Sequence, residues 1–344
     1  MIQEAGALAK RAGGNVARAI LAGVSATCRP PIPLAPALDE PGLVRELLER
    51  TAPHHPVQRY FRSGAEMRAQ SGPAQMIIAP NFRADWATAD GRVAGIEPFL
   101  TNPRFVAAAA ALFESELVEP WGVYSNITWQ LPFDQGGGHT DVPAFVGVDR
   151  RRHPTWLLSV MGHSRLFEKE RVEIATAVAW FYRGQDGGFT YWPDGPDRPP
   201  RVHEGNLFNT AIMGDNDRMY HRVRPVGARR DGMLRGMTLE TTLEHDGGDA
   251  WAIRQDGATL ATMRFDALRV SVSWKAYVYR DAEQRRRHLA EAGGLDLEQV
   301  VDRFGSDLRA RGIAFTPPAD PLHDEAFVSL LTRAYVHEPT VFEA

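Results

Sequence analysis

The sequence predicts a mainly β protein, a sandwich or a barrel, with helices flanking the β region in the chain. From about residue 121 to 280, short runs rich in β-branched and aromatic residues follow one another, separated by glycine, proline and aspartate clusters. Such closely spaced strands favour antiparallel sandwiches and barrels over alternating β–α units. Segments with helical periodicity precede and follow this stretch.

The region before residue 121 is predicted to be a helical layer. Apolar residues recur at helical spacing early in the chain, prolines 30, 31 and 33 form an extended linker, and Pro103 with the alanine run after it favours a helix. The predicted helices span 4–24, from Asp39 or Pro41 to about Arg50, and 103–117.

The β region and the tail follow from the same patterns. Strands are expected at 121–131, 156–160, 178–182, 189–192, 206–212 and 269–279. Asp256-Gly257 predicts a hairpin between 251–255 and 258–263. The tail favours helices at 281–292, 295–312 and 323–335. We therefore expect one composite domain: a helical region 1–120, a β core 121–280 and a helical region 281–344.

Composition excludes some classes of function. The 344 residues carry a formal charge of −4, which predicts no affinity for nucleic acid or an anionic membrane surface. The arginine clusters 150–152 and 285–287 are typical of solvated faces. The single cysteine, Cys28, excludes an intrachain disulfide and favours a reducing compartment. No signal peptide or spanning apolar run is recognisable, so we expect a soluble, cytoplasmic protein.

One short motif carries metal chemistry. His139 and Asp141 follow a glycine run, and residues two apart on a strand point to the same face. An imidazole and a carboxylate would then lie side by side as two ligands of one metal. His221 follows 221 − 141 = 80 residues later. Two histidines and one carboxylate on one octahedral face leave three open positions, as in non-haem Fe(II) oxygenases. The alternative is a buried core histidine and a chance His-x-Asp.

The order of motifs resembles a known family, the Fe(II)/2-oxoglutarate-dependent oxygenases of the prolyl-hydroxylase-like branch. The resemblance covers about residues 121 to 275 and rests on five elements. They are His139-Thr-Asp141, Gly187-Gly188-Phe189, Gly205-Asn-Leu-Phe-Asn209, His221-Arg-Val223-Arg-Pro225-Val226 and Arg269-Val-Ser271. It implies a double-stranded β-helix (jelly-roll or cupin-like) core.

The resemblance also implies cofactors: Fe(II) held by His139, Asp141 and His221, with 2-oxoglutarate and O2 as cosubstrates. The distal carboxylate of 2-oxoglutarate needs a cation, and arginine fits because its charge is permanent and its geometry bidentate. Arg269 with Ser271 has the family's residue pair but lies 269 − 221 = 48 residues after His221, farther than the family spacing. Arg235, at 235 − 221 = 14 residues, keeps the spacing but lacks the serine. We favour Arg269 and take the hairpin as an insertion.

Other residues are candidates for lining the site. Tyr124 and Asn126 are predicted to bind 2-oxoglutarate, and Thr128, Tyr191 and Trp192 to line a substrate pocket. Each is equally compatible with an ordinary polar or packing role in a barrel strand. No catalytic residue beyond the metal triad is required.

The implied reaction is oxidation of a C–H bond in a small molecule, such as an amino acid or natural-product intermediate, with release of succinate and CO2. Asp141 argues against halogenation, because halogenating relatives have a small residue there, and leaves hydroxylation, desaturation or ring closure. The alternatives are a peptidyl hydroxylase, a cupin-like metal hydrolase or isomerase without 2-oxoglutarate, and a non-catalytic β-barrel. The flanking helices would form a lid or a homodimer interface.

Overall fold

A large antiparallel sheet forms the centre of the molecule. The computed structural model describes residues 28–60, 78–133, 137–290 and 293–341. The strand order of this sheet is β1-β10-β7-β15-β5-β3-β2, with β4 beside β3 and β6 beside β7. The strands are β1 (Ile32–Leu34), β2 (His55–Pro56), β3 (Asn81–Thr88), β4 (Gly91–Arg92), β5 (Leu117–Thr128), β6 (Ala144–Phe145), β7 (Arg171–Trp180), β10 (Thr210–Gly214) and β15 (Arg269–Tyr279).

A smaller sheet completes the core. It has the order β11-β8-β9, from β8 (Phe189–Trp192), β9 (Arg201–His203) and β11 (Tyr220–Val223), and His139 extends it through a bridge to His221. Along the chain, β7, β10 and β15 of the large sheet alternate with strands of the small one, because β8 and β9 lie between β7 and β10, and β11 follows β10. This alternation between two sheets is the winding of a double-stranded β-helix, a jelly-roll topology. The predicted fold class, mainly β with flanking helices, is confirmed.

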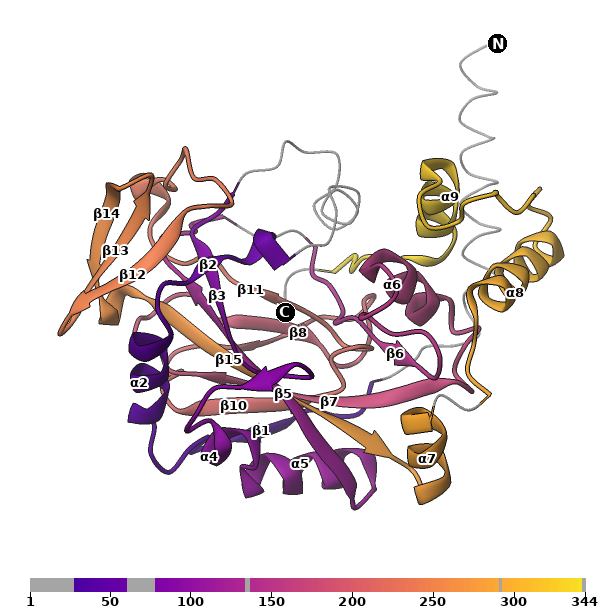
Figure 1. Ribbon diagram of the computed structural model, residues 1–344, viewed down its shortest axis with the longest axis horizontal. Coiled ribbons are helices and arrows are strands. Elements are labelled where there is room, and N and C mark those ends of the chain that lie inside the picture. The colour runs from indigo at the N-terminus through magenta and orange to yellow at the C-terminus, as the bar shows by residue number, and fades with distance from the viewer. Residues whose placement is uncertain (1–27, 61–77, 134–136, 291–292, 342–344) are drawn as a thin grey trace, which may run out of the picture.

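The large sheet has one apolar and one polar face, and β15 shows the division. Val270, Val272, Trp274 and Ala276 alternate with Arg269, Ser271, Ser273 and Lys275, and all eight are buried. The apolar face packs against α2 (Gly42–Thr51), α4 (Glu97–Leu100) and α5 (Pro103–Phe113), which lie along one side of the sheet in Figure 1. The polar face is therefore the interior surface of the β-helix and the natural place for a polar site.

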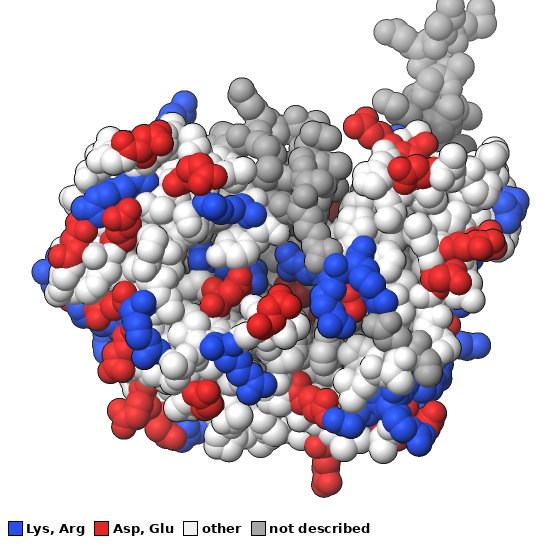
Figure 2. Space-filling model, in the orientation of Figure 1, with Lys and Arg blue, Asp and Glu red and all other residues white. Residues whose placement is uncertain are grey.

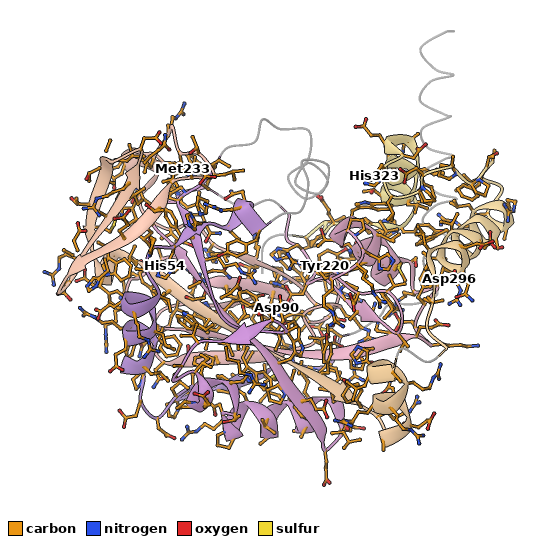
Figure 3. The ribbon with its side chains drawn as sticks, viewed as in Figure 1. His54, Asp90, Tyr220, Met233, Asp296 and His323 are labelled. Carbon is orange, nitrogen blue, oxygen red and sulfur yellow. The ribbon has the colours of Figure 1, made fainter. Side chains whose placement is uncertain are left out.

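The strands β12, β13 and β14 form a separate three-stranded sheet whose apolar side chains, including Leu243 and Trp251, pack into the main core. Its strands are β12 (Thr242–Gly247), β13 (Ala250–Gln255) and β14 (Ala258–Arg264), so the predicted hairpin is confirmed. It lies between β11 and β15 in sequence, which is the insertion inferred from the distance between His221 and Arg269. Backbone hydrogen bonds between His54 and Leu243 tie it to the core, and His54 is labelled in Figure 3.

The remaining helices form a second apolar cluster. It involves α6 (Thr155–Ser164), α8 (Leu297–Ala310) and α9 (Glu325–Tyr335), which gather at the end of the molecule opposite β12–β14 (Figure 1). α7 (Ala282–Ala290) follows β15 directly. The part of the chain that the structure describes also has short 3-10 turns at η1 (Val57–Tyr60), η2 (Arg229–Asp231) and η3 (Phe265–Ala267). Among the described residues, no helix is both long and apolar enough to cross a bilayer.

Some sequence predictions need correction. Residues 156–160, predicted as a strand, belong to α6, where Trp156 packs edge-on against Phe327 of α9. The region before residue 121 is not purely helical, because β1 to β4 join the large sheet. The strand predicted at 206–212 begins at Thr210, and the helix predicted at 103–117 ends at Phe113. The helix predicted at 4–24 lies outside the described residues, and the domain limits stay a prediction.

Charges of both signs intermingle on the surface. Lys and Arg side chains alternate with Asp and Glu across the face shown in Figure 2. Many are paired, for example Arg254 with Asp246 at 2.8 Å and Arg303 with Glu170 at 2.9 Å. This mixture agrees with the near-balanced formal charge.

Candidate metal centre

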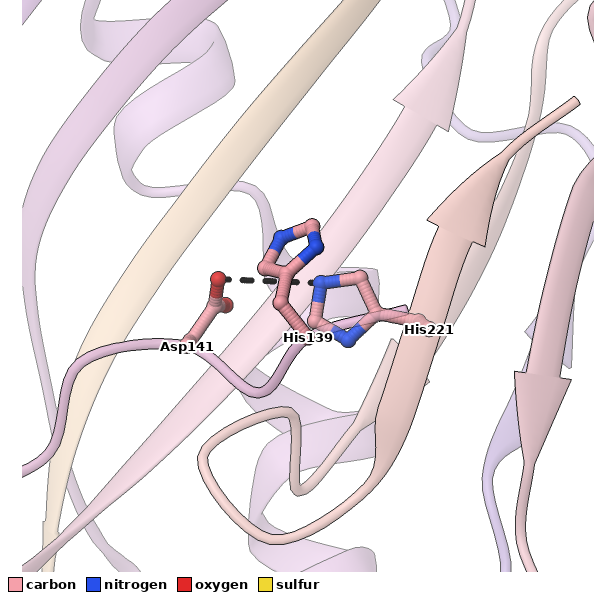
Figure 4. Close-up of side chains that lie close together, drawn as sticks. All are labelled: His139, Asp141 and His221. Atoms are coloured by element: carbon pink, nitrogen blue, oxygen red, sulfur yellow. Dashed lines mark ion pairs between the residues drawn. The ribbon is translucent and has the colours of Figure 1, made fainter. Parts of the chain in front are cut away.

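His139, Asp141 and His221 come together at the edge of the small sheet (Figure 4). One possible ligand atom from each lies within 4.8 Å of those of the other two. The two imidazole rings are 4.5 Å apart between centroids, and His221 Nε2 lies 3.7 Å from Asp141 Oδ1. These side chains form a compact set of three donors, two nitrogens and one carboxylate oxygen.

The backbone holds the ligands in register. His139 and His221 exchange N–H···O bonds of 3.0 and 2.9 Å, and Asp141 N donates to Asn216 O at 2.8 Å. The segment around His139 makes only a single bridge and is not a full strand. Gly138 precedes it at φ +97°, where a Cβ would lie 3.2 Å from the Trp192 ring. A glycine is therefore needed for the chain to pass over Trp192 into the site.

A hydrogen bond selects the tautomer of His221. Its Nδ1 lies 2.9 Å from the carbonyl oxygen of Met219, which can only accept, so Nδ1 carries the proton. Nε2 is then a lone-pair donor, and it is the atom that faces Asp141. Backbone bonds of this kind fix ring orientation in metal-binding histidines. One side of His139 is open to solvent. Burial of the ring among protein atoms, and to a smaller extent the nearby His221, lowers the pKa of His139 to about 4, so its ring is neutral at neutral pH.

Lys275 on β15 contacts the carboxylate of this set. Its Nζ lies 2.8 Å from Asp141 Oδ2 and 2.9 Å from Thr176 Oγ1. Burial alone would raise the pKa of Asp141, but Lys275 and the two histidines outweigh it and hold that pKa below its usual range. The same pairing raises the pKa of Lys275 against the effect of burial. Asp141 is therefore an anion and Lys275 a cation at neutral pH.

A buried ion network supports the turn behind the site. Arg171 Nη1 contacts Asp217 Oδ2 at 2.8 Å, with both side chains almost fully buried. Arg218 pairs with Asp215 at 3.2 Å and also contacts Glu173. Burial and Asp217 raise the pKa of Asp215 well above its usual range. This network fixes the turn between β10 and β11, which supplies the Asn216 carbonyl to Asp141.

Arg269 lies on the same polar face as Lys275, at the other end of β15. Its side chain is fully buried, Nε donates to Gly187 O at 2.5 Å, and Nη1 donates to Ser271 Oγ at 3.3 Å. Among the described residues, Nη2 has no hydrogen-bond partner. Burial lowers the pKa of Arg269 to about 10, so the guanidinium keeps its charge at neutral pH. A buried cation with an unsatisfied N–H group fits an anionic ligand.

The other anchor candidate, Arg235, is exposed between η2 and β12. The structure therefore places Arg269 on the inner face and Arg235 on the surface. Three further predicted residues pair with β15 on that inner face, because Thr128 lies opposite Arg269, Asn126 opposite Ser271 and Tyr124 opposite Ser273. Thr128 Oγ1 donates to Asn81 Oδ1 at 3.1 Å.

The two aromatic residues predicted for the pocket point in opposite directions. Tyr191 pairs with His221 across the small sheet, shares its face and stacks on Phe189. Trp192 pairs with Tyr220 on the other face, and its Nε1 donates to Val341 O at 2.7 Å. The structure thus brings Tyr191, and not Trp192, to the metal-facing side, because strand alternation turns successive side chains apart.

Three residues near the site were not singled out from the sequence. Lys275 and Ser273 continue the period-2 pattern of Arg269 and Ser271, so the alternation of β15 was a usable signal. Arg83, on β3, lies with its guanidinium carbon 3.8 Å from the Tyr124 ring centroid and pairs with Asp85 at 2.8 Å. The strand containing it was not predicted.

The contacts of His163 and Cys28 indicate packing and hydrogen-bonding roles for both residues. His163 lies on α6 with its ring nitrogens 3.4 Å from Thr140 Oγ1 and 3.3 Å from Tyr220 OH. Tyr220 is labelled near the centre of Figure 3. Cys28 is buried with Sγ 3.1 Å from Pro193 O, and burial raises the pKa of its thiol to about 12. A thiol that stays protonated is a poor nucleophile.

The donor set fits a divalent transition metal. Two neutral imidazoles and one carboxylate suit iron, and with three ligands an octahedral ion keeps three positions open. The interior face offers Arg269 for the distal carboxylate of a chelating keto acid. The residues present therefore fit both Fe(II) and 2-oxoglutarate.

Comparisons with known proteins give only distant similarity. No family model matches the sequence, and no curated protein sequence matches it either. Among solved structures, a prolyl-4-hydroxylase from Pseudomonas putida aligns at 12% identity and TM-score 0.31, covering 73% of this chain and 92% of that one. HygX from Streptomyces hygroscopicus, solved with nickel, 2-oxoglutarate and hygromycin B, aligns at 10% and 0.37, covering 74% and 84%.

A third similar structure is SnoN, a non-heme alpha-ketoglutarate-dependent epimerase from nogalamycin biosynthesis. It aligns at 12% identity and TM-score 0.34, covering 83% of this chain and 97% of that one. These overlaps are low, and the strand order described above carries the assignment of the fold.

Proposed function

We propose that the protein is a non-haem Fe(II)- and 2-oxoglutarate-dependent dioxygenase that oxidises a C–H bond of a small molecule. The observation that carries this proposal is the placement of two charged sets on one interior surface. The triad His139, Asp141 and His221 meets at the edge of the small sheet, where Asp141 contacts Lys275 on the polar face of β15. The buried Arg269 with its unsatisfied Nη2 lies on that same face of β15. A metal hydrolase without 2-oxoglutarate has no need of that buried guanidinium.

Each part of the triad has a defined task. His139 and His221 present two imidazole nitrogens, and the bond from His221 to Met219 keeps Nε2 turned toward Asp141. Asp141 supplies one negative charge, which favours a divalent cation over a monovalent one. Bound Fe(II) with 2-oxoglutarate and O2 supplies the oxidising power for the C–H bond, with release of succinate and CO2.

Arg269 and Ser271 bind the cosubstrate in this proposal. Arg269 donates from Nη2 to the distal carboxylate, and the Ser271 hydroxyl adds a second donor. Because the guanidinium is buried, the ion pair forms away from bulk water and gains strength. Tyr124 and Asn126 lie on the adjacent strand, where their polar groups line the space between anchor and metal.

The substrate is proposed to be small and polar. The interior face around the triad carries Tyr124, Asn126, Thr128 and Tyr191, with the Arg83–Asp85 ion pair at its border. Hydroxyl, amide and charged groups of this kind suit an amino acid or a natural-product intermediate better than an apolar compound.

Succinate formation tests the proposal. The protein is incubated with Fe(II), ascorbate, 2-oxoglutarate and a pool of amino acids and natural-product intermediates, with and without O2. We expect O2-dependent succinate well above that of Asp141→Ala, because that variant lacks the anionic ligand. Succinate equal in the wild type and Asp141→Ala contradicts the proposal.

A further inference from the structure

The two oxygens of the Asp141 carboxylate have different neighbours, Lys275 on one side and His221 on the other. Oδ2 lies 2.8 Å from Lys275 Nζ, and Oδ1 faces the His221 Nε2 atom at 3.7 Å. The carboxylate is thus oriented with one oxygen toward β15 and the other toward the histidines.

Lys275 is itself held in place. Its Nζ donates to Thr176 Oγ1 at 2.9 Å on the neighbouring strand β7, and both side chains are buried. On the other side, β5 places Gly122 opposite Lys275, and a Cβ at that position would lie 3.6 Å from the Lys275 Cβ. The hydrogen bond to Thr176 therefore fixes the ammonium group beside Asp141, and the absence of a side chain at Gly122 leaves room for the Lys275 side chain.

The residue type is informative as well. Lysine is rare in this chain, which has three lysines against 36 arginines, and the other two are at positions 10 and 169. An ammonium is a compact donor that fits between Asp141 and Thr176, whereas the guanidinium fork is broader and planar. Burying a cation costs free energy unless it is paired, and Asp141 is its ionic partner.

We propose that Lys275 is a positioning residue that makes Asp141 a one-oxygen metal ligand. By holding Oδ2, the ammonium presents Oδ1 to the metal and prevents the carboxylate from chelating with both oxygens. Two imidazoles and one oxygen then fill three of six octahedral positions. A chelating carboxylate would fill a fourth and leave two.

The number of coordination positions left open on the metal decides whether both 2-oxoglutarate and O2 can bind. This consequence rests on the proposed function. A keto acid that chelates the metal takes two positions, so O2 requires a third. Lys275 preserves that third position. Its effect on the metal alone does not depend on 2-oxoglutarate and can be measured separately.

Anaerobic Co(II) titration of the metal-free full-length protein is the test, followed by visible absorption and by the dissociation constant. The set comprises wild type, Lys275→Met, Lys275→Arg and the matched surface control Lys169→Met, which removes the same charge from an exposed position. Thr176→Val is the milder variant, because it keeps the charge and the fold but removes the second partner of Nζ. Far-UV circular dichroism and melting temperature report folding.

We expect Lys275→Met to bind Co(II) about tenfold to a hundredfold more weakly, as is usual when the partner of a metal ligand is lost. Its Co(II) spectrum should change in band shape and intensity, because the carboxylate is free to chelate. Thr176→Val should weaken Co(II) binding and change the spectrum in the same direction, but by less. Lys275→Arg should fall between wild type and Lys275→Met, because it keeps the charge but its broader guanidinium fits less well between Asp141 and Thr176. Lys169→Met should stay near wild type. A structural role alone would alter melting without altering the spectrum of the bound ion.

Two results for Lys275→Met would overturn the inference: an unchanged Co(II) spectrum, or Co(II) binding as tight as in the wild type or tighter. In either case Lys275 would only fill space beside the metal site or repel the cation, and would not orient Asp141. A second titration adds 2-oxoglutarate to the Co(II)-loaded proteins. If the wild type does not respond while Lys275→Met still differs from it in Co(II) binding, the proposed function fails and the role of Lys275 stands. If the wild type responds and Lys275→Met matches it in both titrations, the role of Lys275 fails alone.

Discussion

Arg269 Nε donates to the carbonyl oxygen of Gly187 at 2.5 Å, across 82 residues of sequence. The Arg269 side chain also packs directly against the backbone of Gly187, because a Cβ at Gly187 would lie 2.6 Å from Arg269 Cδ and 2.8 Å from Nε. Gly187 has a φ of +65°, a conformation that residues with a Cβ rarely adopt. The absence of a side chain at this position therefore sets where the guanidinium lies.

Gly187→Ala is expected to weaken 2-oxoglutarate binding to the metal-loaded protein by about tenfold, equivalent to about 1.4 kcal/mol. The new methyl group displaces Arg269 without removing its charge. Gly205→Ala is the matched control, because Gly205 has a φ of +83° and no atom lies within 4 Å of the place that a methyl group would take there. Calorimetric titration measures both. Equal affinities in the two variants would show that Arg269 can move freely and is not held by Gly187.

Arg269→Lys is expected to raise the dissociation constant for 2-oxoglutarate about tenfold to a hundredfold, the value of one charge-assisted hydrogen bond of about 1.5–3 kcal/mol. Lysine keeps the charge but loses the fork that reaches Gly187, Ser271 and the ligand together. Metal affinity should change little. Arg235→Ala, at the exposed alternative, should bind 2-oxoglutarate like the wild type. The reverse pattern, with loss only in Arg235→Ala, would move the anchor to Arg235.

His54 is expected to make stability depend on pH. It is buried between α2 and β13, with Nε2 3.0 Å from Leu48 O and its ring 6.0 Å from Trp251, and burial lowers its pKa to about 4. The unfolded chain, with the ordinary pKa of about 6.5, binds the proton more readily, so stability is full above that value and falls as the pH drops toward 4. The loss from this residue is on the order of 3 kcal/mol.

Urea unfolding of the metal-free protein at about pH 7.5 and about pH 4.5 measures this dependence. His54→Gln should lose less stability between the two conditions than the wild type, because its side chain does not titrate. His323→Gln serves as the control, since His323 is exposed near α9, far from His54 in Figure 3. A drop as large in His54→Gln as in the wild type would assign the pH dependence to other groups.

The sequence was most informative where residue spacing and strand alternation agree. The hairpin 251–263 and the strand 269–279 have strong β patterns, and both are confirmed. The distance from His221 to Arg269 was explained by the insertion between them. The convergence of His139, Asp141 and His221 followed from motif order, because no local pattern brings residues 80 positions apart together.

Other elements depend on tertiary contacts that a local pattern does not contain. Residues 156–160 combine aromatic and branched side chains in a short apolar run, which periodicity alone does not assign to strand or helix. Packing of Trp156 on α9 favours the helix. Polar and apolar residues alternate along Asn81–Thr88, which is β3, but the helical patterns elsewhere in residues 1–120 predict a helical layer there and not a strand. Lys275 was missed because its partner, Asp141, lies 134 residues away.

Anaerobic titration with Fe(II) and 2-oxoglutarate tests the central claim most directly. The weak visible absorption band of 2-oxoglutarate chelated to Fe(II) requires both the triad and the cosubstrate site. We expect the band to appear in the wild type, to be lost in Asp141→Ala, and to need more 2-oxoglutarate in Arg269→Lys. Stoichiometric Fe(II) binding without the band, or a band that persists in Asp141→Ala, would contradict the account.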